Sequence, residues 1–299
     1  MNRIDLTVII PHYNIPDLLG RCLRSVPETE NIQVVVVDDC SPNSADYYDE
    51  IPELSRSNVE LYSTNQGGSA GRARNVGLEH AKGRWITFLD ADDLFVDNVS
   101  DILEKYIHGN EEIVFFRTIG CMSENIDIPS TRSIYDWQFD LYFRTGCEEH
   151  LRYGFDSLWG KLIKKELIDQ FAIRFDEVRY SNDVYFSGAI GVFAKCIYVA
   201  NEVVYMVTER EGSLTAGKMK DINELIIRYN VALRLQRLYD TYKIKYKNFV
   251  FAHFLNLIFI KDRRLFAEEF IKLSRSNKFR YMYCLLRRIY GLMRESLRL

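Results

Sequence analysis

The sequence predicts an α/β protein with a mostly parallel, doubly wound, Rossmann-like sheet and a helical C-terminal extension. Short apolar runs alternate with helical patterns over about the first hundred residues, and these runs are apolar on both faces. Strands of that kind belong to sheets that are covered by helices on both sides, and such sheets are largely parallel. No strand pattern follows residue 222, which predicts that the end of the chain is helical.

Each element of this fold can be justified from its residues. Strands are expected where aliphatic and β-branched residues cluster, at 6–10, 32–37, 59–62, 85–89 and 113–116. Helices are expected where apolar residues recur at helical spacing, at 16–26, 46–54, 71–81 and 98–108. Regularity fades to about residue 153, helical patterns return at 161–171 and 184–193, and 196–207 is typical of edge strands.

Charge divides the chain into two parts. From Lys243 to Leu299 there are 14 lysines and arginines against 4 acidic residues, whereas residues 1–240 hold 25 basic and 38 acidic residues. We therefore expect two domains, 1–217 and 218–299, of which the second is basic and helical. Within 279–299, apolar residues recur near helical spacing with arginines between them. Such a helix can lie on an anionic membrane surface or pack on its own domain.

The composition excludes several classes of protein. Apolar residues make up 47% of the chain and charged residues 27%, as in packed globular proteins. The longest apolar stretch, Phe249 to Ile260, has 12 residues, whereas a membrane-spanning helix needs roughly 20. The first apolar run is too short for a signal peptide, and the six cysteines lack metal-binding spacing. We expect a cytoplasmic protein, and no motif indicates nucleic-acid binding.

Polar residues follow the predicted strands, where ligands bind an open parallel sheet. The four segments are Pro11-His12-Tyr13-Asn14, Asp38-Asp39, Asn65-Gln66-Gly67-Gly68 and Asp90-Ala91-Asp92-Asp93. Five aspartates are thus expected at one edge of the sheet, and a positive group must accompany them. Asp90 and Asp92 could hold a hard divalent cation against a diphosphate. Alternatively, they are turn or helix-capping residues.

A glycine-rich segment, Gly67 to Asn75, opens the third predicted helix. Its backbone, the helix N-terminus and two arginines suit an anion. It matches neither GxGxxG nor GxxxxGK[ST], which disfavours a dinucleotide-binding fold and a P-loop. The alternative is a flexible turn with solvated arginines.

Taken in order, these motifs resemble those of family 2 glycosyltransferases of the GT-A fold, of the kind found in bacterial capsule and O-antigen gene clusters. The matching segments are Pro11–Asn14, Val36–Asp39, Gly71–Leu78, Ala81–Asp93, Leu158–Leu162 and Ser181–Phe186. The resemblance covers roughly residues 5–215 and is most specific over the first 95.

The resemblance implies an inverting transfer of a sugar from a nucleotide-diphosphate sugar, with UDP favoured by family habit, to a glycan or lipid-linked glycan in cell-surface polysaccharide synthesis. The implied nucleotide-binding residues are Pro11, Tyr13, Asn14, Asp38, Asp39, Asn65, Gly68, Arg74, Asp90 and Ala91. Asp39 would accept from the uracil ring, and Asp92 with Asp90 would hold Mg²⁺ or Mn²⁺. Asp183 would be the catalytic base. The implied sugar and acceptor residues are Trp159, Lys161, Asn182 and Arg210.

Two departures and two other functions bear on this interpretation. Asn182 stands where many family members have Glu, and Arg210 is the nearest candidate for an arginine often found after the last strand. Asp183 could instead be the N-cap of the helix that follows. A sugar nucleotidylyltransferase would need a basic glycine-rich loop after the first strand, which this chain lacks. A catalytically inactive nucleotide- or glycan-binding partner is disfavoured by the intact Asp92 and Asp183.

Overall fold

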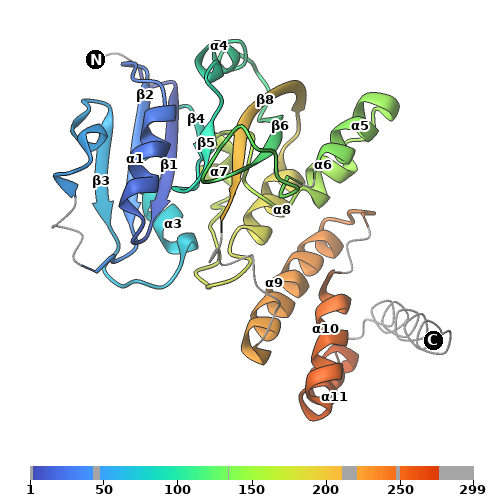
Figure 1. The fold of residues 1–299 in the computed structure, drawn as a ribbon. Coiled ribbons are helices and arrows are strands. Elements are labelled where there is room, and N and C mark those ends of the chain that lie inside the picture. Colours follow the sequence, from blue (N-terminus) through green and yellow to red (C-terminus); the bar gives the residue numbers. More distant parts are fainter. Residues whose placement is uncertain (1–2, 43–47, 134, 211–220, 247–249, 276–299) are drawn as a thin grey trace. The chain divides into compact units, whose positions relative to one another are not determined.

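The computed structural model describes residues 3–42, 48–133, 135–210, 221–246 and 250–275. The chain separates into two compact units, Met1–Ala216 and Gly217–Leu299, and each is described by itself. Figure 1 shows that the first unit is a sheet with helices packed on it and that the described part of the second is helical.

In the described residues the sheet of the first unit has eight strands in the order β3-β2-β1-β4-β7-β6-β8-β5. Their bounds are β1 Leu6–His12, β2 Ile32–Asp38, β3 Val59–Ser63, β4 Trp85–Phe88, β5 Leu94–Phe95, β6 Ile113–Met122, β7 Lys161–Lys164 and β8 Ile197–Glu209. Strand β1 pairs in parallel with β2 and β4, β2 with β3, and β6 with β8. Strand β7 is antiparallel to β4 and β6, and β5 is antiparallel to β8. The sheet is therefore mixed: the four neighbouring strands β3, β2, β1 and β4 are parallel, and β6 and β8 form a further parallel pair.

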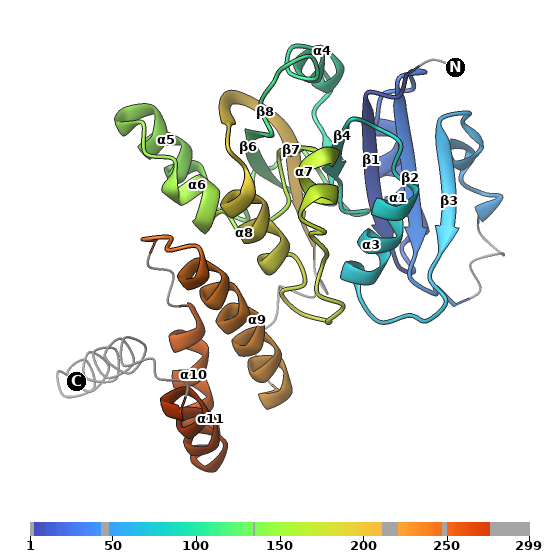
Figure 2. The same ribbon diagram turned by 180° about the vertical axis from the view of Figure 1, so that it is seen from behind.

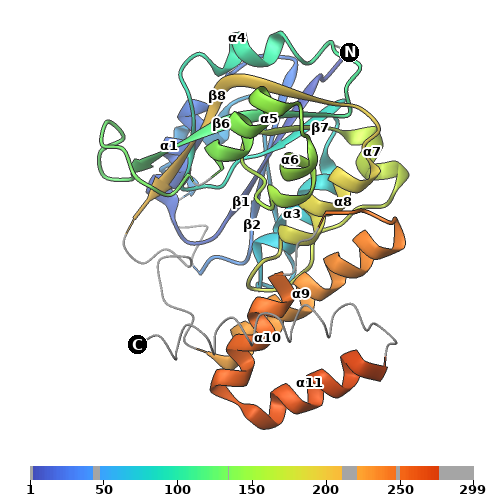
Figure 3. The ribbon, with the colours of Figure 1, turned by 90° about the vertical axis from the view of Figure 1, so that its right-hand side faces the viewer.

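Helices cover both faces of this sheet. Their bounds are α1 Pro16–Ser25, the 3₁₀ helix η1 Pro52–Ser55, α3 Ala70–His80, α4 Val99–Glu104, α5 Asp136–Thr145, α6 Glu149–Gly154, α7 Lys165–Gln170 and α8 Val184–Phe193. Seen from behind, α3, α7 and α8 lie in front of the sheet (Figure 2), while α6 lies beside α8 (Figure 3).

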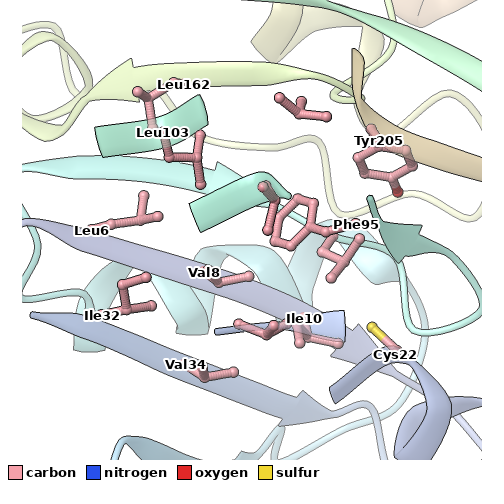
Figure 4. Close-up of a cluster of buried hydrophobic side chains, with 14 of the residues drawn as sticks. Leu6, Val8, Ile10, Cys22, Ile32, Val34, Phe95, Leu103, Leu162 and Tyr205 are labelled. Carbon is pink, nitrogen blue, oxygen red and sulfur yellow. The ribbon is translucent and has the colours of Figure 1, made fainter. Parts of the chain in front are cut away.

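The core explains why the N-terminal strands are apolar on both faces. Alternate residues of β1 and β2, such as Val8 and Val34, pack with Leu19 and Leu23 of α1. Several of these side chains are drawn in Figure 4. The intervening residues of β2 pack instead against Ala73 of α3. Each fully buried Val, Leu or Ile contributes about 1.5–3 kcal/mol relative to an exposed one, so both faces of these strands stabilise the fold.

Several predicted elements differ from the structure. The helix predicted at 161–171 is strand β7 followed by α7, because Leu162 and Ile163 are buried between β4 and β6. The predicted edge strands at 196–207 are one long strand, β8, which pairs on both sides. Helices α5 and α6 were not predicted. Part of the helix predicted at 46–54 lies outside the described residues, and its end is η1.

The described part of the second unit consists of α9 Ile222–Thr241, α10 Val250–Lys261 and α11 Arg263–Arg275. Leu225, Tyr229 and Leu255 are fully buried in its apolar core. In the described part of the chain, no helix combines the length and the apolar character that crossing a membrane requires. The basic segment 279–299 lies outside the described residues.

Candidate active site

The loop after β4 carries two half-buried carboxylates, and each of them meets an arginine from another element. Oδ1 of Asp90 accepts from Nη2 of Arg74 on α3 at 2.6 Å. Oδ2 of Asp90 accepts from Nε1 of Trp159 at 3.3 Å. Oδ2 of Asp92 lies 3.3 Å from Nε of Arg210, just after β8. Residues from four parts of the sequence therefore converge here.

The backbone of this loop is fixed by Asp93 and by three residues that were not among the predicted site residues, Arg21, Tyr205 and Thr208. The Asp92 carbonyl accepts from Thr208 Oγ1 at 2.7 Å and from Arg21 Nη2 at 2.6 Å. The carboxylate of Asp93 accepts from the Tyr205 hydroxyl at 2.8 Å and from the Thr208 N–H at 2.7 Å. Burial raises the pKa of Asp93 well above its usual range. Asp93 thus anchors the loop on β8.

At the ends of β1 and β2, the two adjacent aspartates differ. Asp38 continues the face of Val34 and Val36. It is 2% exposed and accepts from the Ser41 N–H at 3.1 Å. Its carboxylate stabilises a turn through Ser41, and the nucleotide-binding role expected of Asp38 stays a prediction. The carboxylate of Asp39 accepts from Thr64 Oγ1 and from the Gly68 N–H, each at 2.9 Å.

The other predicted nucleotide-binding residues lie along the same edge. Tyr13 is 57% exposed, and Asn14 adopts a left-handed φ of 50° with its N–H donating to Ser41 Oγ. Pro11 and Ala91 are buried, whereas Asn65 and Gly68 are exposed. Of the five aspartates expected at this edge, three are satisfied by N–H and O–H donors, and only Asp90 and Asp92 pair with cations in the described residues.

Asp183 occupies the N-cap position of α8, but its side chain makes no capping hydrogen bond. The carboxylate is half-buried. Burial is the main cause that raises its pKa to about 6, the charge of Asp156 adds to the rise, and Arg74 opposes it. The helix-cap interpretation therefore accounts for the position of Asp183 but not for its side chain.

Lys161, which is expected to shape the sugar and acceptor pocket, is a buried residue of β7. It is 1% exposed, and its Nζ donates to the Phe155 carbonyl at 2.5 Å with the Phe155 ring centroid 4.5 Å away. Burial lowers the pKa of Lys161 to about 7, while Asp156 and Asp183 act to raise it. Lys161 is thus a buried amine whose charged form is disfavoured by burial and favoured by the charges of Asp156 and Asp183. Asp156, which sequence reasoning missed, accepts from the Tyr135 hydroxyl at 2.7 Å.

Arg74 joins the two halves of the site. It is 6% exposed, and while Nη2 donates to Asp90, Nη1 donates to Oδ1 of Asn182 at 2.7 Å. Asn182, expected among the acceptor residues, therefore contacts this arginine. One guanidinium therefore contacts both the Asp90 carboxylate and the segment that carries Asp183.

The site can be tested for its fit to a divalent cation. In residues that the structure describes, no group of three or more His, Cys, Asp or Glu side chains could ligate a metal ion by itself. Asp90 and Asp92 supply two oxygen donors. Burial, and after it the negative charge of Asp90, raises the pKa of Asp92. Mg²⁺ commonly binds through one or two carboxylates together with substrate phosphates and water. The pair fits that pattern.

Comparison with known proteins identifies the family. The family model described as glycosyl transferase family 2 matches residues 7–171. The chain belongs to this family. It is a glycosyltransferase.

Individual relatives agree with this assignment. The chain is 29% identical over 228 residues to the glycosyltransferase GlyA of Streptococcus pneumoniae, a match over 70% of this chain and 31% of GlyA. It is 30% identical over 124 residues to WfgD of Escherichia coli, a UDP-Glc:alpha-D-GlcNAc-diphosphoundecaprenol beta-1,3-glucosyltransferase, over 38% of this chain and 48% of WfgD. The chain thus spans less than half of either relative.

Among solved structures, residues 1–349 of TarS from S. aureus in complex with UDP-GlcNAc are similar to this chain. The TM-score is 0.60 at 21% identity, over 87% of this chain and 74% of the TarS chain. This similarity concerns the fold, which is the mixed α/β GT-A fold.

Proposed function

We propose that this glycosyltransferase is an inverting enzyme that uses a nucleotide-diphosphate sugar, with UDP as the nucleotide. Its acceptor is a glycan or lipid-linked glycan in cell-surface polysaccharide synthesis. The observation that carries the proposal is the position of Arg74 between Asp90 and Asn182, because it brings a diphosphate-binding edge and a candidate base together. WfgD, by its name a UDP-glucose enzyme acting on a lipid-linked acceptor, supports the donor and acceptor classes.

On the donor side, Asp90 and Asp92 would hold Mg²⁺ or Mn²⁺. Such an ion neutralises the charge that develops on a diphosphate leaving group. Arg74 fixes Asp90 in place, and Arg210 is close enough to Asp92 to add a charge-assisted donor to the phosphates. Asp39, held by two donors, presents its remaining acceptor capacity to the N–H of a uracil ring, and the exposed Tyr13 offers a face for stacking.

On the acceptor side, Asp183 accepts the proton of the attacking hydroxyl. The oxygen forms its bond to the anomeric carbon as the bond to the diphosphate breaks, so one displacement inverts the configuration. A carboxylate with a pKa of about 6 is ionised at neutral pH and more basic than an ordinary aspartate, which suits a general base. Trp159, half-buried beside Asp90, lies where the transferred sugar would be bound.

We further propose that the protein acts at the cytoplasmic face of the membrane. A lipid-linked acceptor is presented there, and the net positive charge of residues 243–299 favours an anionic surface.

The test is a thermal-shift titration with UDP, GDP, TDP and CMP, each with and without Mn²⁺, followed by a transfer assay with the matching sugars. We expect a metal-dependent rise in Tm with UDP that Asp92→Ala abolishes, because a ligand that binds only the native state stabilises it. A rise that does not depend on metal would contradict the role of Asp92. Formation of a nucleotide sugar from sugar 1-phosphate and UTP would favour the nucleotidylyltransferase, and no shift with any nucleotide would favour an inactive partner.

A further inference from the structure

Helix α3 begins within the glycine-rich segment Gly67 to Asn75, and its first turn also contacts the segment that leads to Asp183. Arg74 donates to Asn182, as described above, and Nε of Arg72 pairs with Oε2 of Glu177 at 2.9 Å. A Cβ on Gly71 would overlap the carbonyl oxygen of Asp176. Glycine therefore lets the segment 175–183 lie directly against the first turn of α3.

Asn75 makes the most specific of these contacts. It is 9% exposed, its Oδ1 accepts from the Phe175 N–H at 2.9 Å, and its Nδ2 donates to the Phe175 carbonyl at 3.2 Å. One side-chain amide thus satisfies both backbone groups of a buried residue, much as a neighbouring strand would. A two-point attachment fixes orientation as well as distance, which a single hydrogen bond does not.

The ring of Phe175 packs against α8, so the position of Phe175 also constrains the position of this helix. It stacks on Phe186 with centroids 4.0 Å apart and an interplanar angle of 7°. Both rings also contact Phe88 of β4 edge-on. Phe186 lies in the first turn of α8, and the N–H of the next residue, Ser187, donates to the Asp183 carbonyl at 2.9 Å. A continuous set of contacts runs from Asn75 to the backbone of Asp183.

We propose that Asn75 is a positioning residue for Asp183, which holds the base at a fixed place relative to the donor-binding end of α3. The proposal rests on the function proposed above. Asn75 does not touch the reacting atoms. It acts through Phe175 and Phe186, so its loss should displace the base while the nucleotide-binding edge stays intact.

The test compares Asn75→Asp with a matched control, Asn58→Asp. The Asn75 variant keeps the acceptor for the Phe175 N–H, loses the donor to the carbonyl, and places a charge beside Glu177, whose Oε1 lies 3.3 Å from Nδ2. In the control, Asn58 also donates to backbone carbonyls, those of Pro27 and Ile32, at a place remote from the site. Asn75→Ser serves as a second variant if Asn75→Asp does not fold.

A displacement of about 1 Å can cost on the order of 100-fold in rate. We expect Asn75→Asp to lower kcat by 10- to 100-fold, with the KM for the nucleotide sugar and the UDP-induced thermal shift nearly unchanged. Asn58→Asp should lower Tm with kcat close to wild type. Equal kcat in the two variants, or an Asn75 variant that loses UDP binding as much as turnover, would overturn the proposal.

Amide hydrogen exchange tests the same contacts and does not require that the enzyme be active. Asn75→Asp should speed exchange over residues 175–187 and leave β1 and β2 unchanged, whereas unchanged exchange over 175–187 overturns the inference even in a wild-type enzyme without detectable transfer. Such an inactive wild type would count against the proposed function alone. The two failures are therefore distinguishable.

Discussion

At the scale of single residues, Asp183 stands out because its environment disfavours its charge. Burial and the negative charge of Asp156 raise its pKa to about 6, while Arg74 acts in the opposite direction. A base in this range gains basicity without becoming protonated at neutral pH. From this raised pKa we make two predictions, one about the rate of transfer and one about the stability of the protein.

The rate of transfer should fall as the pH drops through about 6, where Asp183 takes up a proton. Removal of the neighbouring negative charge in Asp156→Asn should lower the pKa of Asp183, because a like charge disfavours ionisation. The acid limb of kcat/KM for the acceptor should then move to lower pH. The measurement is kcat/KM between pH 4.5 and 8, with Asp140→Asn on the exposed face of α5 as the control. An acid limb at the same pH in all three proteins would contradict this account.

Asp183→Asn should abolish most transfer, a loss of about 10²–10⁴-fold, and yet stabilise the protein at neutral pH. The folded-state pKa of Asp183 lies above its unfolded value of 3.8, so ionisation costs stability as the pH rises from about 4 to about 6. The variant lacks that cost and should be more stable above pH 6, by up to about 3 kcal/mol. Below pH 4 the difference should vanish. Thermal unfolding at pH 4 and pH 7.5 measures it, and equal differences in Tm at both values would refute the assignment.

Candidate site residues that belong to short, ordered motifs can be predicted from the sequence, whereas the others cannot. Asp39, Asp90 and Asp92 follow strands that can be predicted from their apolar runs, so their common edge follows from the topology of a parallel sheet. Asn75 bonds to Phe175 a hundred positions away, and Asp156 bonds to Tyr135, which directly precedes the unpredicted helix α5. Contacts of this kind depend on tertiary packing, which no local pattern encodes.

At the scale of elements, the sequence predicts many of the helices and strands, but it does not show which residues of a helix contact the neighbouring elements. Strands β1 and β2 were predicted because burial on both faces leaves a continuous apolar run. Strand β7 was predicted as part of a helix. It has only four residues, apolar and basic, and α7 follows it directly, so the apolar residues of the two elements together show a helical period. Helix α3 was predicted, but only the structure shows that two of its glycines face different partners.

Substitution of each of these two glycines of α3 by alanine should affect stability and activity differently. A Cβ on Gly77 would overlap Ile9 of β1, whereas a Cβ on Gly71 would overlap the Asp176 backbone in the segment before Asp183. Overpacking typically costs about 1–3 kcal/mol. Gly77→Ala should therefore lower Tm and leave kcat per folded molecule unchanged, and Gly71→Ala should lower both. Comparable kcat in the two variants, measured at a temperature where both are folded, would show that the segment before Asp183 tolerates displacement.

At the scale of the whole molecule, charge is divided between the ends of the chain. Residues 243–299 hold 14 basic and 4 acidic residues, while the part that carries the candidate site is acidic. A basic segment is attracted to anionic lipid by about 1 kcal/mol per Lys or Arg near the surface. This attraction would raise the local concentration of the enzyme at the surface where the proposed lipid-linked acceptor would be found.

The full chain should therefore sediment with vesicles that contain phosphatidylglycerol and not with vesicles of phosphatidylcholine alone. Salt should reverse the binding, because the Debye length falls from about 10 Å at 0.1 M to about 3 Å at 1 M. Arg287, Arg288 and Arg294 changed together to Gln should weaken binding. The matched control changes Arg24, Lys82 and Lys105 in the first unit, which are well exposed. If both triple variants bind alike, overall charge rather than the basic end governs adsorption, and strong binding to neutral vesicles would point instead to apolar insertion.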